Sequence, residues 1–452
     1  MFQFFLGLVL CLPFVADSGQ STGGGGIRRA LSPSRQPGTS SQAAFLDASA
    51  FGFSTADKVG SGNFAGLAGI EASAMAQGHL FLRFAPGIYK IRMPLPGEPG
   101  YLGPSATACM FTDLHDIVID ASKATFVLSN DTVKDAALFA FSGCSDVTLN
   151  FNFVGTHTNR NNGMRGIFLK NNNNKFNIIF SSNRMFEGIR VGNWEDPAVY
   201  RSAVFEGNQD IAIKAKCVDT YYAVPCYLTD KLDIQCESRG TASGGFAAYR
   251  AVYLNGCSNV KAVSRTLNLA APDGVNIIGS GPQYSEPRML GCRNVWLNAT
   301  DLGSTQYVQY QSLVKFNIVS ASTDNVSSIQ DNINVRVDLK ITPSVWRNNS
   351  AVVFGSLGAS AAHEFKNITL SGSIVRTVDG DHSTVSVEDG AIGLSKLDIT
   401  FRDFSDKGVS RKPLTLYIPP SLSGVKVTGR AYRSQIGRVA VANPAIQALA
   451  VH

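Results

Sequence analysis

The chain has 452 residues, 44% of them hydrophobic, so it can bury a large core, and neither a disordered chain nor a small disulfide-stabilised domain fits it. Only 16% of residues are charged and 43 are glycine, which favours turns over surface helices and indicates an all-β fold. The net charge of +6 comes without concentrated basic runs, which suits an acidic polymer and argues against a nucleic-acid partner.

The N-terminus begins with an apolar run at residues 4–15, followed by Ala-Asp-Ser at 16–18. This pattern predicts a signal peptide over residues 1–18 and a secreted protein, with a virion-surface protein as the alternative. The run is too short to span a bilayer, and no other segment is long and apolar enough, so we expect no membrane span. Residues 19–42 are rich in Gly, Ser and Pro and predict a flexible linker.

A short helix and then a strand region are expected next. Leu67, Ile70 and Ala74 recur at helical spacing within residues 64–77, and residues 79–91 read as strands.

The remainder of the chain repeats two short strand patterns. Gly-Cys-Ser-Asp-Val at 143–147 has close copies at 256–260 and 291–295, with looser copies at intervals of roughly thirty residues. Strands of a second class lie between them, and in these Ile167, Ile189 and Ile211 are spaced by 22 residues. This length suits one coil of a β-solenoid, in which each coil rises by about 4.8 Å. Alternation predicts one core row, made of Ile167, Ile189, Ile211, Val252 and Val275.

The helix followed by Phe-Ala-Pro-Gly-Ile-Tyr-Lys-Ile at 84–91 resembles the capping helix and first strand of the pectate-lyase-like superfamily. That superfamily of right-handed parallel β-helices includes polysaccharide lyases, polygalacturonases and phage tailspikes. The resemblance implies an all-β, single-stranded right-handed parallel β-helix over residues 43–330, with an N-terminal capping helix. Residues 331–452 then form further coils or a separate, less regular C-terminal β domain.

The outward positions of the second strand class form the candidate binding face. The positions after the core row hold Phe168, Arg190, Ala212, Tyr253 and Asn276, with Lys170 and Lys214 two further on. The positions two before the core row hold Arg165, Glu187, Gln209, Arg250 and Asp273. Aromatic rings stack on sugars and cations bind carboxylate or sulfate groups, so the face predicts an acidic polysaccharide as substrate. The binding residues are then Phe168, Lys170, Tyr253, Asp273 and Asn276.

Glu187 and Asp210 are the candidate carboxylates for glycoside hydrolysis. They fall on adjacent coils of the predicted stack, which puts their carboxyl groups roughly 5 to 9 Å apart, the span of an acid and its nucleophile or base. The alternative for Glu187 is a salt bridge with Arg165 on the neighbouring strand. Residues 208–214 resemble a polygalacturonase strand, but Asn208 and Gln209 stand where that family has its two aspartates, so Asp210 would act in a different arrangement.

Elimination from a uronic acid is the second candidate reaction. It needs a cation for the carboxylate and a base for the neighbouring proton, and the candidates are Arg190, Lys214 and Tyr253. We expect no required cofactor. Calcium is the one considered, through Glu187, Asp210 or Asp273, although the sequence has no dense acidic cluster or calcium-loop motif.

Seven cysteines follow the predicted signal peptide. Cys144, Cys257 and Cys292 share one place in their coils and are expected as buried thiols. Cys217 and Cys226 are the candidates for a disulfide in an oxidising compartment, with Cys236 as an alternative partner. The asparagines at 159–162 and 171–174 are expected to be structural, inside turns.

Two kinds of function remain open. The first is a secreted or virion-borne polysaccharide-degrading enzyme, a glycoside hydrolase or polysaccharide lyase acting on an acidic glycan. The alternative is a non-catalytic β-helix that serves as an adhesin, tailspike or glycan-binding module. Monomer and homotrimer are both open, because a tailspike groove can run between subunits.

Overall fold

Nearly all of the structure is built from parallel strands. The computed structural model describes residues 44–98, 107–128, 136–155, 164–192, 207–241, 248–271, 274–280, 288–289, 291–304, 312–319, 328–329, 332–344, 351–357, 365–376, 385–387, 396–403, 414–417, 426–433, 439–441 and 450–451. The predicted signal peptide and linker lie outside these residues. In the described part, no helix is long and apolar enough to cross a membrane.

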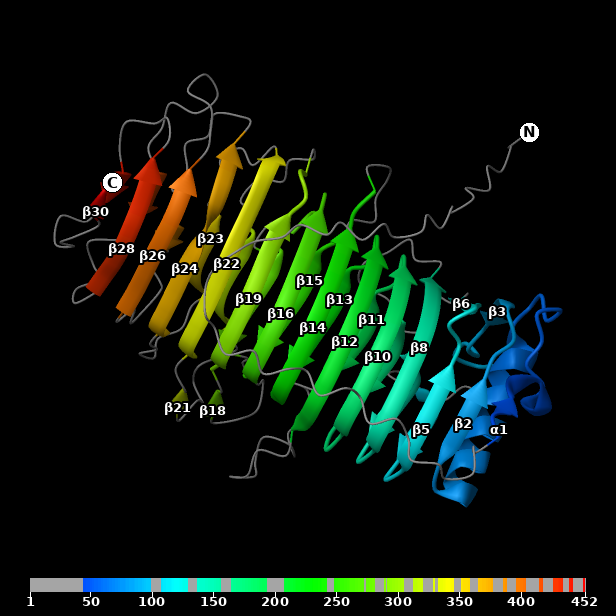
Figure 1. Ribbon diagram of the computed structural model, residues 1–452. Coiled ribbons are helices and arrows are strands. Elements are labelled where there is room, and N and C mark those ends of the chain that lie inside the picture. Colours follow the sequence, from blue (N-terminus) through cyan, green and yellow to red (C-terminus); the bar gives the residue numbers. More distant parts are fainter. Residues whose placement is uncertain are drawn as a thin grey trace, which may run out of the picture. The chain divides into compact units, whose positions relative to one another are not determined.

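The first of two large sheets, here the long-strand sheet, follows the chain order (Figure 1). Its strands are β1 (Leu46–Asp47), β2 (Leu80–Arg83), β5 (His115–Asp120), β8 (Ser145–Gly155), β10 (Asn174–Asn183), β12 (Asn208–Val218), β14 (Thr229–Arg239), β16 (Ser258–Leu267), β19 (Arg293–Asp301), β22 (Asn332–Ser344), β24 (Phe365–Arg376), β26 (Lys396–Asp403), β28 (Lys426–Arg433) and β30 (Ala450–Val451). Two further members, β3 (Gly87–Ile91) and β6 (Ala124–Leu128), pair with each other, and β6 also pairs with β8.

The second sheet, here the short-strand sheet, takes the strands that alternate with these along the chain. They are β4 (Thr107–Thr112), β7 (Ala137–Ser142), β9 (Arg165–Leu169), β11 (Glu187–Val191), β13 (Tyr222–Tyr227), β15 (Arg250–Asn255), β17 (Asn276–Ser280), β20 (Val314–Val319), β23 (Val352–Leu357), β25 (Val385–Val387), β27 (Leu414–Tyr417) and β29 (Val439–Val441). A small separate pair is β18 (Arg288–Met289) with β21 (Ser328–Ile329). Because each coil adds one parallel strand to each large sheet, the predicted parallel β-helix is confirmed.

The core lies between the two sheets. In β10, Phe176, Ile178 and Phe180 are buried while the residues between them face outward, the period-2 pattern of a strand with one buried face. Aromatic rings stack from coil to coil where they are in register, as in Phe316 and Phe354, whose ring centroids are 4.5 Å apart. Burial of such rows on every coil is the main stabilising contribution to a solenoid of this kind.

The predicted core row is correct in part. Ile167 pairs with Ile189 in the short-strand sheet. Ile211 belongs instead to the long-strand sheet, where its partners are Phe176 and Leu232, although it points into the same core. The prediction was wrong here because short alternating apolar runs are alike in both sheets, and a constant spacing in sequence does not tell which sheet a strand joins.

The predicted helix is confirmed as α1 (Ser61–Gln77), which follows a short 3-10 helix, η1 (Ala48–Phe51). Leu67, Ile70 and Ala74 are buried in the core cluster of the solenoid. The Asp57 carboxylate accepts a hydrogen bond of 2.9 Å from the Asn63 backbone N–H and so satisfies part of the helix start. After residue 330 the described strands, from β22 to β30, pair within the same two sheets as the earlier coils.

A left-handed residue recurs at the start of the long strands. Asp116, Asp146, Lys175, Asp210, Lys231, Asn259, Asn294, Asn334 and Asn367 all have φ between 53° and 58°. Asparagine and aspartate tolerate this conformation best among residues with a Cβ. The side-chain amides of Asn294, Asn334 and Asn367 each donate a 3.1 Å hydrogen bond to the amide oxygen of the preceding coil's asparagine. This row, here the amide ladder, begins at Asn259.

The asparagines at 159–162 and 171–174, which the sequence predicted to be structural, are not part of the amide ladder. The Asn173 amide is buried and donates to Asn208 at 2.9 Å, a structural contact as predicted. Residues 159–162 lie outside the described residues.

We expect Asn294→Ala to lower the free energy of unfolding by about 2 kcal/mol. The substitution removes two ladder hydrogen bonds, and it places alanine, which has a Cβ but no side-chain amide, in the left-handed region. Asn294→Gly should cost about half as much, since glycine adopts this φ freely. Urea denaturation of both variants measures the difference, with Asn177→Ala, on the outer face of β10, as the control. Equal losses for alanine and glycine would contradict the role of φ.

All cysteines in the described part of the chain are free and buried. Cys217 is the penultimate residue of the long strand β12 and Cys226 lies in the short strand β13, and no disulfide joins them. The Cys257 thiol donates to the Cys226 backbone oxygen at 3.4 Å, and burial raises the pKa of this thiol. The prediction of buried core thiols is therefore confirmed for Cys144, Cys257 and Cys292.

Candidate functional site

The outer face of the short-strand sheet carries two rows of side chains that register lines up across the coils. The first row is Met110, Ala140, Phe168, Arg190, Pro225, Tyr253, Ile277, Lys315 and Val353. The second row is Arg165, Glu187, Tyr222 and Arg250. Cations and aromatic rings therefore share one face of this sheet.

Gly188 explains how Glu187 and Arg190 reach the same face. A Cβ at Gly188 would lie 2.3 Å from the Phe180 ring, so this position points into the core and only glycine fits it. Ile189 is also in the core cluster. Two consecutive residues, Gly188 and Ile189, therefore face the core, and the alternation is shifted by one residue. As a result Glu187 and Arg190, three positions apart, both point outward.

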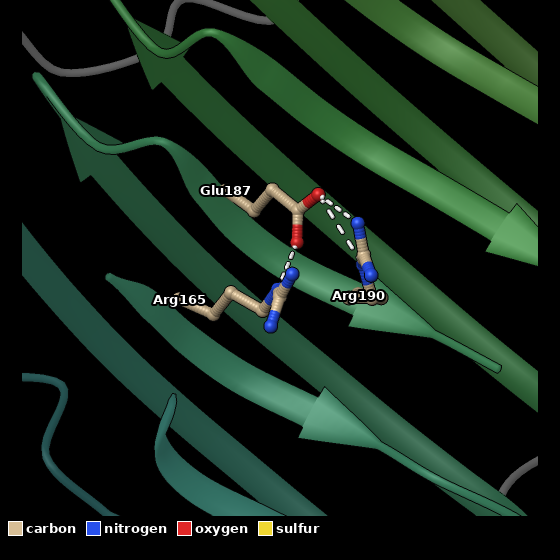
Figure 2. A network of polar contacts seen from close by, with 3 residues as sticks. All are labelled: Arg165, Glu187 and Arg190. Carbon is tan, nitrogen blue, oxygen red and sulfur yellow. Dashed lines mark hydrogen bonds and ion pairs between the residues drawn. The ribbon is translucent and has the colours of Figure 1, made fainter. Parts of the chain in front are cut away.

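Glu187 is held between two arginines (Figure 2). Arg165 donates from Nε to Glu187 Oε2 at 2.6 Å, and Arg190 donates from Nη2 to Oε1 at 2.8 Å. The side chains are 4%, 1% and 7% exposed for Arg165, Glu187 and Arg190, so the pairs are screened little by solvent. The salt bridge considered as the alternative for Glu187 is the arrangement that the structure has, with Arg190 as a second partner.

The triad keeps Glu187 ionised. Burial alone would favour the neutral acid, but the charges and hydrogen bonds of Arg190 and Arg165 outweigh it and lower the pKa of the Glu187 carboxyl. A general acid in glycoside hydrolysis needs the opposite shift. Two cations on one carboxylate also leave the triad with one net positive charge.

Five aromatic residues form a tyrosine cluster beside the triad: Phe186, Tyr221, Tyr222, Tyr249 and Tyr253. Phe186 stacks on Tyr221, and Tyr221 stacks on Tyr249 with a centroid distance of 4.7 Å and an angle of 15°. Tyr222 stacks on Tyr253 at 6.2 Å. All five are half-buried, so their rings reach the surface in an ordered array.

Arg250 places a positive charge within this cluster. Its guanidinium carbon lies 4.8 Å from the ring centroid of Tyr249, 4.9 Å from that of Tyr253 and 5.6 Å from that of Tyr222. Such contacts orient a cation against the negative faces of the rings. Burial raises the pKa of the Tyr222 phenol, with Arg250 opposing it, so Tyr222 stays neutral at ordinary pH.

The structure brings several predicted residues together. Phe168, Arg190 and Tyr253 are aligned in one row by register, as predicted, and Glu187 lies in the row beside it. Phe168 and Arg190 are buried, however, at 8% and 6% exposed, and Phe168 packs against Ala137 and Ala140. Lys170 follows β9 and approaches Phe168, with its Nζ 5.9 Å from the ring centroid.

Other predicted residues lie elsewhere. Asp210 and Lys214 are exposed residues of β12 in the long-strand sheet, so the predicted pairing of Glu187 with Asp210 depended on an incorrect register. Asn276 is buried and donates from Nδ2 to the Leu313 backbone oxygen at 3.0 Å, so it does not face a ligand. Asp273 lies outside the described residues.

Sequence reasoning missed most of the tyrosine cluster. Phe186, Tyr221 and Tyr249 each stand one position before a member of the second row, namely Glu187, Tyr222 and Arg250. This was the available signal, but the spacing between them is irregular, 35 and then 28 residues. A search at one constant period does not align them.

The residues considered for calcium do not form one set of ligands, because Glu187 is occupied by two arginines and Asp210 is on the other sheet. Among the described residues, no group of three or more His, Cys, Asp or Glu side chains is placed to hold a metal ion.

Comparisons with known proteins give fold likeness only. No protein-family model and no curated protein matches the sequence. The A-module of the mannuronan C-5 epimerase AlgE4 from Azotobacter vinelandii has 13% identity and a TM-score of 0.43, with 89% of this chain and 97% of that chain covered. The Streptococcus pneumoniae surface adhesin PfbA has 13% identity and a TM-score of 0.41, covering 80% and 92%. The A-module of AlgE6 from A. vinelandii has 11% identity and a TM-score of 0.31, covering 88% and 99%.

Proposed function

We propose that the chain is an extracellular or virion-borne polysaccharide lyase that binds an acidic glycan across the tyrosine cluster and cleaves it by β-elimination. The observation that carries this proposal is Arg250 held against Tyr222, Tyr249 and Tyr253. The rings stack on one another, so they present their edges and phenol hydroxyls to the sugar units, and the cation favours units that carry a carboxylate.

The reaction needs a proton to leave the carbon next to the uronate carboxylate. A base takes this proton, the electron pair forms a carbon–carbon double bond, the bond to the glycosidic oxygen breaks, and that oxygen is protonated. Arg250 and Arg190 supply positive charge where the carboxylate gains electron density. Tyr253 is assigned the proton transfer, since its ring is half-buried at the face, whereas Tyr227 is fully buried behind Arg190.

Hydrolysis fits the face less well. Glu187 is the single carboxylate in the described strands of the short-strand sheet, and it is ionised and enclosed by arginines. Inverting and retaining glycosidases both require two carboxyl groups flanking the scissile bond.

A panel of acidic glycans tests the proposal. We expect absorbance from unsaturated uronates to rise together with new reducing ends on at least one glycan. Reducing ends without that absorbance indicate a hydrolase and contradict the proposal.

The second candidate is a non-catalytic glycan-binding module. The observation in its favour is that Glu187 is hydrogen-bonded to both Arg165 and Arg190. These bonds hold the three side chains in fixed positions, which suits recognition of a ligand without catalysis. Binding of an acidic glycan without any cleavage would support this candidate over the lyase.

A further inference from the structure

Trp296 in β19 is an exposed indole on the outer face of the long-strand sheet. It is 40% exposed, while Val295 and Leu297 on either side of it are buried. A single exposed apolar residue is common on protein surfaces and by itself indicates nothing. The groups around Trp296 distinguish this one.

The indole is held in a fixed orientation. Its Nε1–H donates to Asp338 Oδ2 at 2.7 Å, and Asp338 also accepts from Arg336 Nε at 3.0 Å and from the Ser371 hydroxyl. Burial opposes ionisation of Asp338, but these hydrogen bonds and the Arg336 charge outweigh it and lower the pKa of the carboxyl. An ionised acceptor fixes the ring, which reduces the entropy that a stacking ligand would lose.

Two cations flank the ring on the adjacent coils. Lys261 and Arg336 are the register partners of Trp296 in β16 and β22. The Lys261 Nζ and the Arg336 guanidinium carbon each lie 5.7 Å from the indole centroid. The Arg336 side chain is 61% exposed, and its contact with Asp338 uses Nε, so the terminal nitrogens are available to an anion.

The amide ladder lies two residues before this row on the same strands, and Asn294 and Asn334 are exposed, as Trp296 and Arg336 are. The amides of Asn294 and Asn334 each donate one N–H and accept one hydrogen bond along the row. An amide has two N–H groups and two oxygen lone pairs, so Asn294 and Asn334 each retain one donor and one acceptor toward solvent. The ladder repeats at the coil rise of about 4.8 Å, close to the length of one pyranose unit in an extended chain.

We propose that Lys261, Trp296, Arg336 and the adjoining amide ladder form a second binding site, here the tryptophan site, for an anionic oligosaccharide. The exposed edge of the indole contacts the C–H groups of one sugar, the two cations bind its carboxylate or sulfate, and the amides bind hydroxyls of neighbouring units.

This site does not depend on the lyase proposal. It lies on the other sheet and requires no cleavage. A chain that proves inert toward every glycan can still bind at Trp296, and a working lyase can lack this site.

The full-length chain is titrated with an oligogalacturonate hexasaccharide, a heparin-derived hexasaccharide, neutral cellohexaose and a single-stranded oligonucleotide of matched charge. Calorimetry gives the affinity and stoichiometry of binding, and tryptophan fluorescence emission detects a ligand that contacts the Trp296 indole. We expect Trp296→Ala to weaken binding of at least one anionic hexasaccharide by about tenfold. Trp296→Phe should retain part of the affinity and lose the ligand-induced change in emission.

Ile179→Ser is the matched control, since Ile179 is 43% exposed on the same face in β10 and its register partners, Asn150 and Lys214, are not part of the tryptophan site. It should leave affinity unchanged, and thermal melting checks that every variant is folded. Lys261→Gln combined with Arg336→Gln should remove the preference for anionic over neutral sugars. Unchanged affinity and stoichiometry in Trp296→Ala would overturn the site, as would tighter binding of the oligonucleotide or equal binding of cellohexaose.

Discussion

Replacing Glu187 by alanine is expected to lower the free energy of unfolding by about 3–5 kcal/mol, the cost typical of breaking a buried ion pair from one side. The variant leaves Arg165 and Arg190 close together, with side chains that are 4% and 7% exposed, and without the carboxylate that both contact. Thermal or urea denaturation measures the loss. Glu237→Ala is the matched control, because the Glu237–Arg239 pair is exposed and should contribute less than about 1 kcal/mol.

A triple variant separates the effect of the unpaired cations from that of the lost contact. Arg165→Met, Glu187→Leu and Arg190→Met together remove all three charges, so we expect stability near that of the unaltered chain. A triple variant as unstable as Glu187→Ala would show that the triad stabilises the fold through its own bonds.

The pH dependence has a definite sign. The pKa of Glu187 is lower in the folded chain than in the unfolded chain, so its contribution is fully present above the ordinary glutamate pKa and is lost as pH falls through the folded value. The unaltered chain should therefore become less stable than the triple variant as pH falls through the folded pKa of Glu187, although the two have similar stability at neutral pH.

Replacing Tyr253 by phenylalanine is expected to reduce glycan cleavage by about 10²–10⁴-fold while leaving glycan affinity within a few-fold, as for removal of a general base. The ring keeps its stacking on Tyr222 and its contact with Arg250, and only the hydroxyl is lost. Initial rates of absorbance from unsaturated uronates measure cleavage, and calorimetry measures binding.

Tyr249→Phe is the matched control, because Tyr249 also contacts Arg250 and stacks in the same cluster. It should retain most of the cleavage. Equal losses in the two variants would argue against a specific proton transfer by Tyr253.

The sequence by itself predicted the parallel β-helix from its repeated strand patterns and the resemblance at residues 84–91, and predicted the N-terminal helix from the helical spacing of Leu67, Ile70 and Ala74. Rows such as Phe176, Ile178 and Phe180 can be buried only if coils stack, and stacking follows from a strand length repeated many times. The same local reasoning placed Phe168, Arg190 and Tyr253 in one row.

Only the tertiary structure decided which strand joins which sheet, and with that which side chains meet. Ile211 has the spacing of Ile189 but pairs with Phe176, which removes Asp210 and Lys214 from the face that holds Glu187. The tyrosine cluster and the tryptophan site join residues from coils of unequal length. The physical reason is that turns between strands vary in length while hydrogen-bond register does not, so neighbours across coils are set by strand pairing and not by distance along the chain.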